Sequence, residues 1–158
     1  MNPVATAAIA LGSNLPSIFG LPQDNLREAI QRISALGTIK AVSSFHTTAP
    51  VGYLDQPQFI NAAALLETTL SPLELLRGLL EIERAMGRDR NSALAKGPRI
   101  IDLDLLLYDD VILTGPELIL PHAAMHERAF VLAPLAEIAP ELRHPTLHAT
   151  VTELLAAL

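Results

Sequence analysis

The sequence predicts an α+β fold of the ferredoxin-like, split βαβ kind: an antiparallel sheet with helices packed on it and a helical C-terminal extension. Three observations support this prediction. The expected elements follow the order β-α-β-β-α-β before the helical tail. Two of the segments between strands have the apolar period of amphipathic helices. The 158 residues contain no internal repeat or low-complexity linker, so we expect a single domain over residues 1–158.

The first strand and helix are predicted near the N-terminus. Residues 4–12 are small and apolar and lead into the polar run at 12–14, which indicates a buried strand followed by a turn. Beyond Pro22, apolar residues recur at the helical period. Asp24 is the expected N-cap of this helix, and Gly37 is expected to end it.

Two further strands are predicted in the next part of the chain. Residues 39–48 are rich in β-branched and small residues, and residues 59–69 are largely apolar. The segment 49–57 between them contains two prolines and Gly52, which favour a loop.

The second helix has the clearest start signal. Ser71 is the expected N-cap, a proline follows it, and Glu74 completes a capping box. The apolar period stops at Gly87. A polar loop at 88–99 and a strand at 100–108 are expected after it.

The C-terminal part is predicted to be helical. We expect a helix over residues 123–132 that is broken by Pro134, and a short terminal helix that is capped by Thr150 and Glu153. In the split βαβ arrangement the helices pack on one face of the sheet. The other face is then expected to be free for a binding site.

Composition excludes several classes of function. The formal net charge of −6 disfavours a general nucleic-acid binder, and an aromatic content of 4% disfavours a base-stacking sheet. The absence of cysteine excludes disulfides and thiolate metal sites. The first apolar stretch has no basic region before it and is too short to span a bilayer. We therefore expect a cytoplasmic protein that has neither nucleic acid nor membrane as a partner. We also expect a monomer.

Positive charge is concentrated in one segment. From Arg84 to Arg99 the chain has five basic residues and one acidic residue, a net charge of +4, which leaves −10 for the other residues. A basic loop in an acidic protein indicates a site for a polyanion such as the phosphates of a nucleotide. The alternative is a solvated loop after a helix, where cations suit the helix dipole.

Two aspartates follow the basic segment on a predicted strand. Asp102 and Asp104 are two residues apart, so they share a face, with Cα atoms about 6.6 Å apart. Carboxylates so placed can bind one Mg²⁺ or bridge two. The alternative is a pair of polar positions on a half-exposed strand, but two like charges directly after an arginine-rich loop, with Arg99 three residues before Asp102, favour the metal site. Arginine and metal together are what triphosphate binding and phosphoryl transfer require.

The spacing of His122 and His126 is that of some zinc sites. Zinc is disfavoured because Glu127 is not where such motifs require it and no third ligand stands nearby. His122, at a helix start, is better suited to contact an anion, with Arg128 as a second cation. We expect His126 to face solvent. A structural or exposed position is expected for His144 and His148.

Five groups of residues occur in an order that is specific as a set. They are Gly12-Ser13-Asn14; Ser43-Ser44-Phe45 with Thr48; Asp55-Gln56-Pro57 with Phe59-Ile60-Asn61; Gly97-Pro98-Arg99-Ile100-Ile101-Asp102-Leu103-Asp104; and Pro121-His122 through Arg128 and Phe130. Over about residues 5–140, the chain resembles the 6-hydroxymethyl-7,8-dihydropterin pyrophosphokinases.

The resemblance implies an ATP- and Mg²⁺-dependent enzyme of folate biosynthesis that transfers pyrophosphate from ATP to the hydroxymethyl group of the dihydropterin and releases AMP. It implies two Mg²⁺ ions at Asp102 and Asp104, and catalytic roles for these residues, Arg88 and Arg99. The implied ATP contacts are Glu83, Arg90, Lys96, Leu105, His122 and Arg128. The implied pterin contacts are Thr48, Ala49, Val51, Phe59, Asn61 and Phe130, with the two phenylalanines stacked on the ring. The segments 49–57 and 87–98 are implied to be lids.

The chain departs from the family pattern at Ala49, Lys96 and Ala123, where proline, tryptophan and a larger residue are common. These departures concern the lids and ATP affinity rather than the reaction. Two other classes remain as alternatives. A ligand-binding module without catalysis is disfavoured by the aspartate pair beside an arginine-rich loop, and an RNA-binding sheet is disfavoured by the charge and the few aromatic residues.

Overall fold

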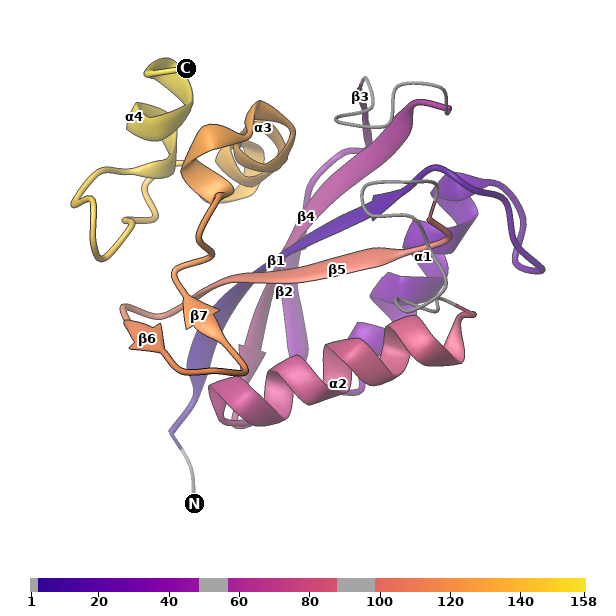
Figure 1. The fold of residues 1–158 in the computed structure, drawn as a ribbon, viewed down its shortest axis with the longest axis horizontal. Coiled ribbons are helices and arrows are strands. Elements are labelled where there is room, and N and C mark those ends of the chain that lie inside the picture. Colours follow the sequence, from indigo (N-terminus) through magenta and orange to yellow (C-terminus); the bar gives the residue numbers. More distant parts are fainter. Residues whose placement is uncertain (1–2, 49–56, 88–98) are drawn as a thin grey trace.

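The computed structural model describes residues 3–48, 57–87 and 99–158, and it has an antiparallel sheet at its centre (Figure 1). The strand order is β2-β4-β1-β5, and β3 also pairs with β4. The strands of this sheet are β1 (Ala5–Ser13), β2 (Thr38–Val42), β3 (His46–Thr48), β4 (Phe59–Thr68) and β5 (Asp102–Tyr108). The remaining elements are α1 (Pro22–Ile33), α2 (Pro72–Ala85), the hairpin β6 (Leu113–Thr114) and β7 (Ile119–Leu120), the 3₁₀ turn η1 (Met125–Glu127), α3 (Ala129–Ile138) and α4 (Val151–Ala156).

Two of the predicted helix starts are confirmed. In α2, the Glu74 N–H donates to Ser71 Oγ at 3.2 Å, and the Ser71 N–H donates to the Glu74 carboxylate at 2.8 Å. The same reciprocal pair joins Thr150 and Glu153 at the start of α4. Both pairs satisfy backbone donors that have no partner inside the helix.

The predicted N-cap of α1 is wrong by one turn. The helix begins at Pro22, and Asp24 lies inside its first turn. The Asp24 carboxylate accepts a hydrogen bond from the Leu21 N–H at 3.0 Å. An acidic residue stabilises this end of the helix from either position, which is why the composition alone did not separate them.

The single strand predicted at 39–48 is two strands, β2 and β3. They are separated around Ser43, whose N–H donates to the Ala63 carbonyl and whose Oγ accepts from the Ala63 N–H, both at 2.9 Å. A serine side chain thus replaces a backbone carbonyl in the ladder with β4. The β6–β7 hairpin was not predicted.

The helix predicted at 123–132 is also wrong in its bounds. The chain forms the short turn η1 and then α3, which runs through Pro134 to Ile138. Proline removes one intrahelical hydrogen bond, that to the Phe130 carbonyl. The helix continues because Val131 and Leu135 on either side of this position are buried against the sheet.

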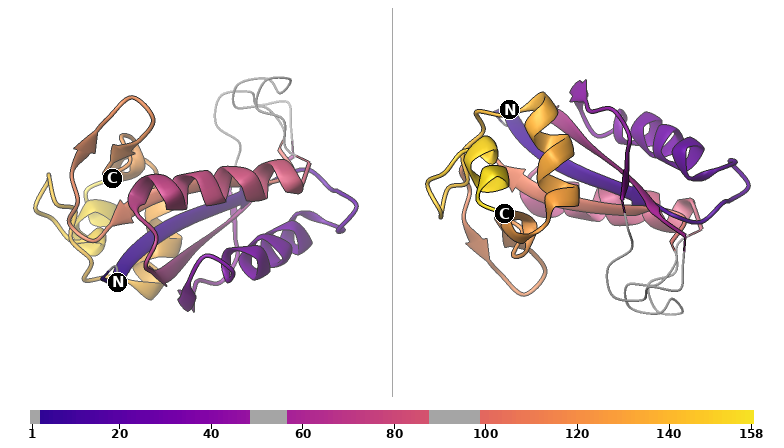
Figure 2. Two further views of the ribbon diagram at one scale, coloured as in Figure 1. Left: turned by 90° about the horizontal axis from the view of Figure 1, so that it is seen from below. Right: turned by 90° about the horizontal axis from the view of Figure 1, so that it is seen from above.

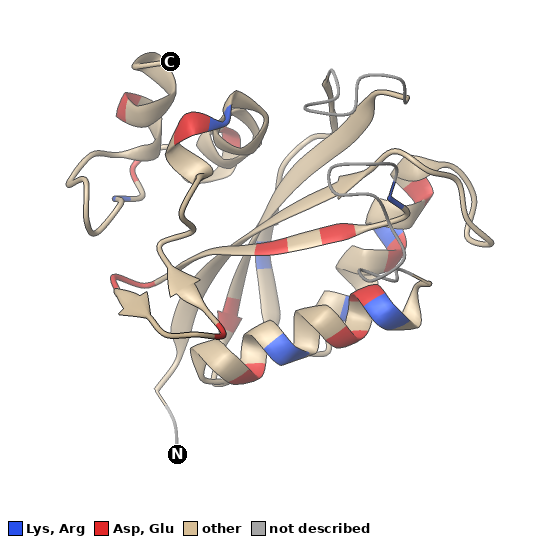
Figure 3. Ribbon diagram, viewed as in Figure 1, with Lys and Arg blue, Asp and Glu red and all other residues tan. Residues whose placement is uncertain are grey.

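Both faces of the sheet carry helices, which corrects the expectation of a free face (Figure 2). Alternation along β1 explains the two layers. Ile9 and Leu11 pack in the core with α1 and α2, whereas Ala8 and Ala10 belong to the core with α3 and α4. Two acidic positions interrupt the mostly apolar β5 at Asp102 and Asp104 (Figure 3).

No helix among the described residues is long and apolar enough to cross a membrane.

Candidate active site

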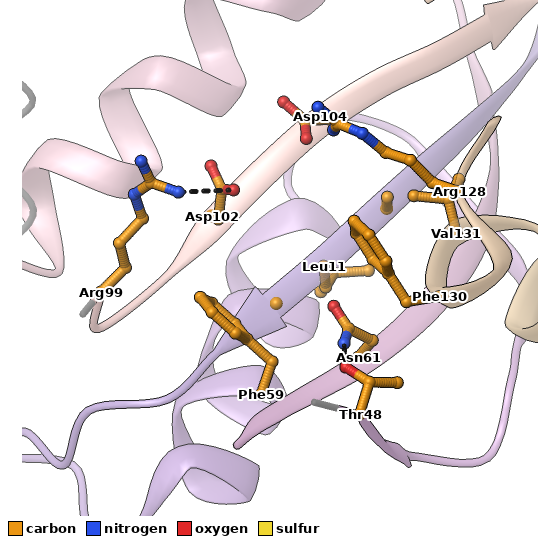
Figure 4. A pocket seen from close by; sticks show the side chains of 12 residues that line it. Leu11, Thr48, Phe59, Asn61, Arg99, Asp102, Asp104, Arg128, Phe130 and Val131 are labelled. Carbon is orange, nitrogen blue, oxygen red and sulfur yellow. Dashed lines mark hydrogen bonds and ion pairs between the residues drawn. The ribbon is translucent and has the colours of Figure 1, made fainter. Parts of the chain in front are cut away.

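A pocket opens on the α3 face of the sheet, at the end where β1 stops and β4 and β5 begin (Figure 4). Strand β1 lines it with Ala10, Leu11 and Gly12. A Cβ atom on Gly12 would lie 3.0 Å from Asn61 Oδ1, so glycine is what allows Asn61 to approach the strand closely. The other lining residues are Thr48, Phe59, Asn61, Arg99, Asp102, Asp104, Arg128, Phe130 and Val131.

One wall of the pocket is charged. Asp102 and Asp104 are half-buried and lie on the same face of β5, as the sequence predicted, while Leu103 between them is buried in the core on the other face. Arg99 Nη1 lies 3.7 Å from an Asp102 oxygen. The Arg99 side chain is 17% exposed, and its Nε has no hydrogen-bond partner among the described residues. A buried guanidinium donor of this kind suits an anionic ligand.

Arg128 and His122 add donors beside Asp104. The Arg128 guanidinium carbon lies 5.7 Å from the centre of the Phe130 ring, and the side chain extends past it toward Asp104 (Figure 4). Burial lowers the pKa of His122 below its usual value, and the charge of Arg128 lowers it further, against the opposing effect of Asp104. His122 Nδ1 accepts from the Ala124 N–H at 3.2 Å. A neutral His122 ring therefore carries its proton on Nε2, as a donor.

The opposite wall is aromatic and carries one amide. Phe59 on β4 and Phe130 on α3 lie on either side of Asn61 (Figure 4). Asn61 Nδ2 donates to Thr48 Oγ1, which fixes the orientation of the amide. Two flat apolar rings with one oriented amide between them suit a planar heterocycle with polar edges.

Two other phenylalanines have structural positions. Phe19 lies under the Arg32 guanidinium at 5.6 Å, and Phe45 lies under that of Arg27 at 5.5 Å. Neither lines the pocket. Of the four phenylalanines, the two predicted to bind a ring are the two that the fold brings to the pocket.

The basic segment reaches the pocket at only one of its described ends. Arg99 lines the pocket, whereas Arg84 is exposed on α2 and pairs with Glu81. The charge density of the sequence did not separate these two arginines. Five predicted site residues lie outside the described part of the chain: Ala49, Val51, Arg88, Arg90 and Lys96. The two predicted lids, apart from Pro57 and Gly87, lie outside it as well.

The structure places three of the predicted ATP contacts outside the pocket lining: His122, which lies near Asp104 and Arg128, and Glu83 and Leu105. Glu83 on α2 is 2% exposed, and its carboxylate accepts from the Leu103 N–H at 2.7 Å. Leu103 is the residue between the two aspartates, so Glu83 holds the backbone that carries them. Leu105 is buried in the core with α1 and α2. Its side chain lies on the opposite face of β5 from the pocket.

His126 is half-buried in η1 rather than turned to solvent, which corrects the prediction for this residue. Its ring lies 6.0 Å from that of the buried His144 in an edge-to-face contact. The described part of the chain contains no group of three or more potential metal ligands among histidine, aspartate and glutamate.

Two buried amides beside the pocket were missed. Asn14 follows β1 and Asn25 lies on α1, and both are at most 1% exposed. Asn25 falls within the apolar stripe of its helix, and Asn14 directly follows a buried strand. A polar residue in a buried position needs a partner, and this signal could have identified both.

The protein-family model described as 7,8-dihydro-6-hydroxymethylpterin-pyrophosphokinase (HPPK) matches residues 8–140. The chain belongs to this family. It is 44% identical over 139 residues to the 2-amino-4-hydroxy-6-hydroxymethyldihydropteridine pyrophosphokinase of Pseudomonas aeruginosa, with 87% of this chain and 82% of that protein covered. It is 46% identical over 142 residues to the enzyme of the same name from Haemophilus influenzae, with 89% and 85% covered.

A solved structure of HPPK-DHPS from Plasmodium falciparum with pteroate has the same fold. The TM-score is 0.79 at 16% sequence identity, and the match covers 99% of this chain and 45% of that chain. The family and the reaction predicted from the sequence are thus confirmed: this HPPK chain transfers pyrophosphate from ATP to 6-hydroxymethyl-7,8-dihydropterin in folate biosynthesis.

Proposed function

We propose that the pocket at the ends of β1, β4 and β5 is the place where this chain transfers pyrophosphate. The observation that carries the proposal is the division of one pocket into two walls. Carboxylates and arginines line the β5 side, and two phenylalanines with an amide line the β4 and α3 side. The first wall suits the phosphates of ATP, and the second suits the pterin ring.

On the charged wall, Arg99 and Arg128 bind the phosphates, and His122 donates a further hydrogen bond from Nε2. The Arg99 Nε, which has no partner within residues 3–48, 57–87 and 99–158, supports this assignment, because an anionic oxygen would satisfy it. Asp102 and Asp104 hold Mg²⁺, and we propose that two ions bind there. Their carboxylates are the hard oxygen donors that Mg²⁺ prefers, and both line the pocket. When bound, the ions neutralise phosphate charge.

On the aromatic wall, Phe59 and Phe130 sandwich the pterin ring and Asn61 binds its polar edge. Thr48 acts through Asn61 by holding the amide in one orientation. Binding the pterin costs the two phenylalanine side chains little conformational freedom, because β4 and α3 already hold their rings in place.

In the reaction, the hydroxymethyl oxygen of the pterin forms a bond to the β-phosphorus of ATP. The bond between that phosphorus and the oxygen of the α-phosphate breaks, the hydroxyl loses its proton, and AMP leaves. Arg99 and Arg128 stabilise the charge that develops on the transferred group. Catalysis then rests on positioning and charge stabilisation rather than on a covalent intermediate.

Several finer assignments stay proposals. Glu83 acts as a positioning residue for the two aspartates, through the Leu103 N–H. Leu105 contacts ATP through its backbone at most, since its side chain is in the core. ATP contacts by Arg88, Arg90 and Lys96, and pterin contacts by Ala49 and Val51, rest on the family pattern.

The strand order β2-β4-β1-β5, with α1 and α2 on one face, supports the ferredoxin-like class as a proposal. A single domain, a monomer and a cytoplasmic location also stay predictions.

The test is a product assay with purified protein, ATP, Mg²⁺ and hydroxymethyl-dihydropterin, followed by chromatography of nucleotides and pterins. We expect AMP and pyrophosphorylated pterin in equal amounts, and neither after a chelator is added. Two variants test whether this pocket is the active site. Phe59→Ala should raise the KM for pterin, and Asp102→Asn should abolish turnover. Full activity in both folded variants would place the reaction elsewhere.

A further inference from the structure

One buried amide lies where the two walls of the pocket meet. Strand β1 runs between β4 and β5, with Ser13 opposite Ile60 on β4 and Gly12 opposite Asp102 on β5. The C-terminal end of β1 therefore lies between the N-terminal ends of both neighbours. Asn14 is the first residue beyond that end, and it is 1% exposed.

Asn14 holds the start of β5 through its backbone and its side chain. The Asn14 N–H donates to the Arg99 carbonyl at 3.0 Å, and the Arg99 N–H donates to Asn14 Oδ1 at 2.7 Å. Both backbone groups of Arg99 are thereby bonded to one residue. This fixes the backbone three positions before Asp102, on the charged wall.

The other end of the same amide holds the approach to β4. Asn14 Nδ2 donates to the Pro57 carbonyl at 3.1 Å, two residues before Phe59 on the aromatic wall. A carboxamide has an acceptor at one end and a donor at the other, like a peptide group. One side chain therefore bonds to the segments that lead into both neighbouring strands, just beyond the end of β1.

A second buried amide supports the first. Asn25 on α1 is fully buried, and its Nδ2 donates to the Leu15 carbonyl at 2.8 Å and to the Ile100 carbonyl at 3.2 Å. The residues after Asn14 and Arg99 are thus tied to the same helix. The amide of Asn14 is held in a rigid frame, so a shift on one wall is transmitted to the other.

We infer that Asn14 is a positioning residue that couples the phosphate wall to the pterin wall. It sets the placement of Arg99 and Asp102 relative to Phe59, and so the placement of ATP relative to the hydroxymethyl oxygen. The inference rests on the proposed roles of these walls. It predicts that mutations can separate the effect of losing the donor end of the amide from the effect of losing both ends.

The test compares two substitutions of Asn14 with a buried polar control. Asn14→Asp keeps the acceptor for the Arg99 N–H and loses the donor to Pro57, so the KM for pterin should rise about tenfold while the KM for ATP changes by less than about twofold. Asn14→Leu loses both, and kcat should also fall by about 100-fold because the reacting groups are misplaced. The control is Thr68→Val, which removes a buried hydrogen bond to the Leu36 carbonyl at the far end of β4.

A double-mutant cycle provides a readout that a purely structural role would not move. In a Phe59→Ala background, Asn14→Asp should raise the KM for pterin by less than about twofold further, because the ring it positions is gone. Asn14→Asp is nearly isosteric, so it carries the test if Asn14→Leu does not fold. The inference is overturned if Asn14→Asp lowers the melting temperature as Thr68→Val does and leaves both KM values and kcat unchanged. If Asp102→Asn and Phe59→Ala are also fully active, the proposed site itself is wrong.

Discussion

The two faces of the central sheet are built from the same strands, but one face is a continuous core and the other also lines the pocket. On the face with α1 and α2, β5 contributes Leu103 and Leu105 to a continuous aliphatic core. On the other face the same strand contributes Asp102 and Asp104 to the pocket, and only farther along does Leu106 pack in the core with α3. Successive residues of one strand are therefore divided between the core and the proposed active site.

The difference shows why a small domain can carry a charged site without losing its core. The period of two in a strand lets one face be wholly apolar while the other exposes carboxylates. The helix layer with α3 and α4 covers part of its face, and the pocket occupies the end that remains. Mutations on the two faces should then separate activity from stability.

The largest effect is expected from the aspartates. Asp102→Asn or Asp104→Asn should lower kcat by about 1,000-fold or more, because in the proposed site each carboxylate is a charged oxygen ligand of Mg²⁺ and contributes to the field that orients the phosphates. The melting temperature should change little, since both side chains are half-buried rather than part of the core. Steady-state kinetics and thermal unfolding measure the two quantities. Near-normal turnover in either folded variant would contradict the metal assignment.

A core residue on the opposite face should behave in the reverse manner. Leu79 on α2 is fully buried, so Leu79→Ala should lower the free energy of unfolding by about 2–5 kcal/mol. Both KM values should stay within about twofold of wild type at a temperature where the variant is folded. Urea unfolding provides the free energy. A specific rise in one KM would mean that the two faces are not separable.

Arginines at different places on the fold sharpen the comparison further. Arg99→Ala should lower kcat/KM for ATP by about 100-fold, because its guanidinium lies inside the pocket. Arg143→Ala is the matched control, since Arg143 lies in the C-terminal tail and bonds to the His148 carbonyl. Equal losses in the two variants would show that total positive charge, rather than position, determines ATP binding.

A smaller effect, on the KM for pterin, is expected from a comparison of two phenylalanines. Phe130→Leu should raise the KM for pterin by about tenfold, because a branched aliphatic side chain cannot stack on a planar ring. Phe19→Leu should leave the KM unchanged, since Phe19 lies under Arg32 and away from the pocket. Binding measured by pterin fluorescence would report on the same difference without turnover. A rise in both variants would indicate an indirect effect through stability.

The smallest effect concerns how α3 is attached to the sheet. Hydrogen bonds from the Ser44 side chain, the Ser44 N–H and His46 lower the pKa of Glu137 to about 2 from a usual 4.5. A lowered folded-state pKa stabilises the fold above about pH 4.5, and this contribution is lost as the pH falls toward 2. The melting temperatures of wild type and Glu137→Gln should therefore differ at pH 7 and converge near pH 2.

Exposed Glu141 provides the control for that measurement. Glu141→Gln should not show the same pH-dependent difference from wild type. A difference for Glu137→Gln that persists unchanged down to pH 2 would contradict the role of the Glu137 charge in holding α3.

Local signals predicted the parts of the molecule that depend on neighbours in sequence. The capping boxes at Ser71 and Thr150 and the shared face of Asp102 and Asp104 are all correct. They follow from hydrogen bonds three residues apart or from the period of a strand. The bounds around Pro134 are wrong because tertiary burial of α3 outweighs the local cost of a proline.

The sequence by itself determined the family and the reaction, because an ordered set of motifs specifies them without coordinates. It also determined that Asp102 and Asp104 share one face of β5, because a strand has a period of two. The motifs also selected Arg99 and Phe130, which line the pocket, over Arg84 and Phe19, which do not. Only the tertiary structure decided that Glu83 and Leu105, two of the predicted ATP contacts, have buried side chains outside the pocket lining. It also decided that Asn14 bridges Arg99 and Pro57. These residues are far apart in the chain, and the pairing of β1 with both β4 and β5 is what brings them together.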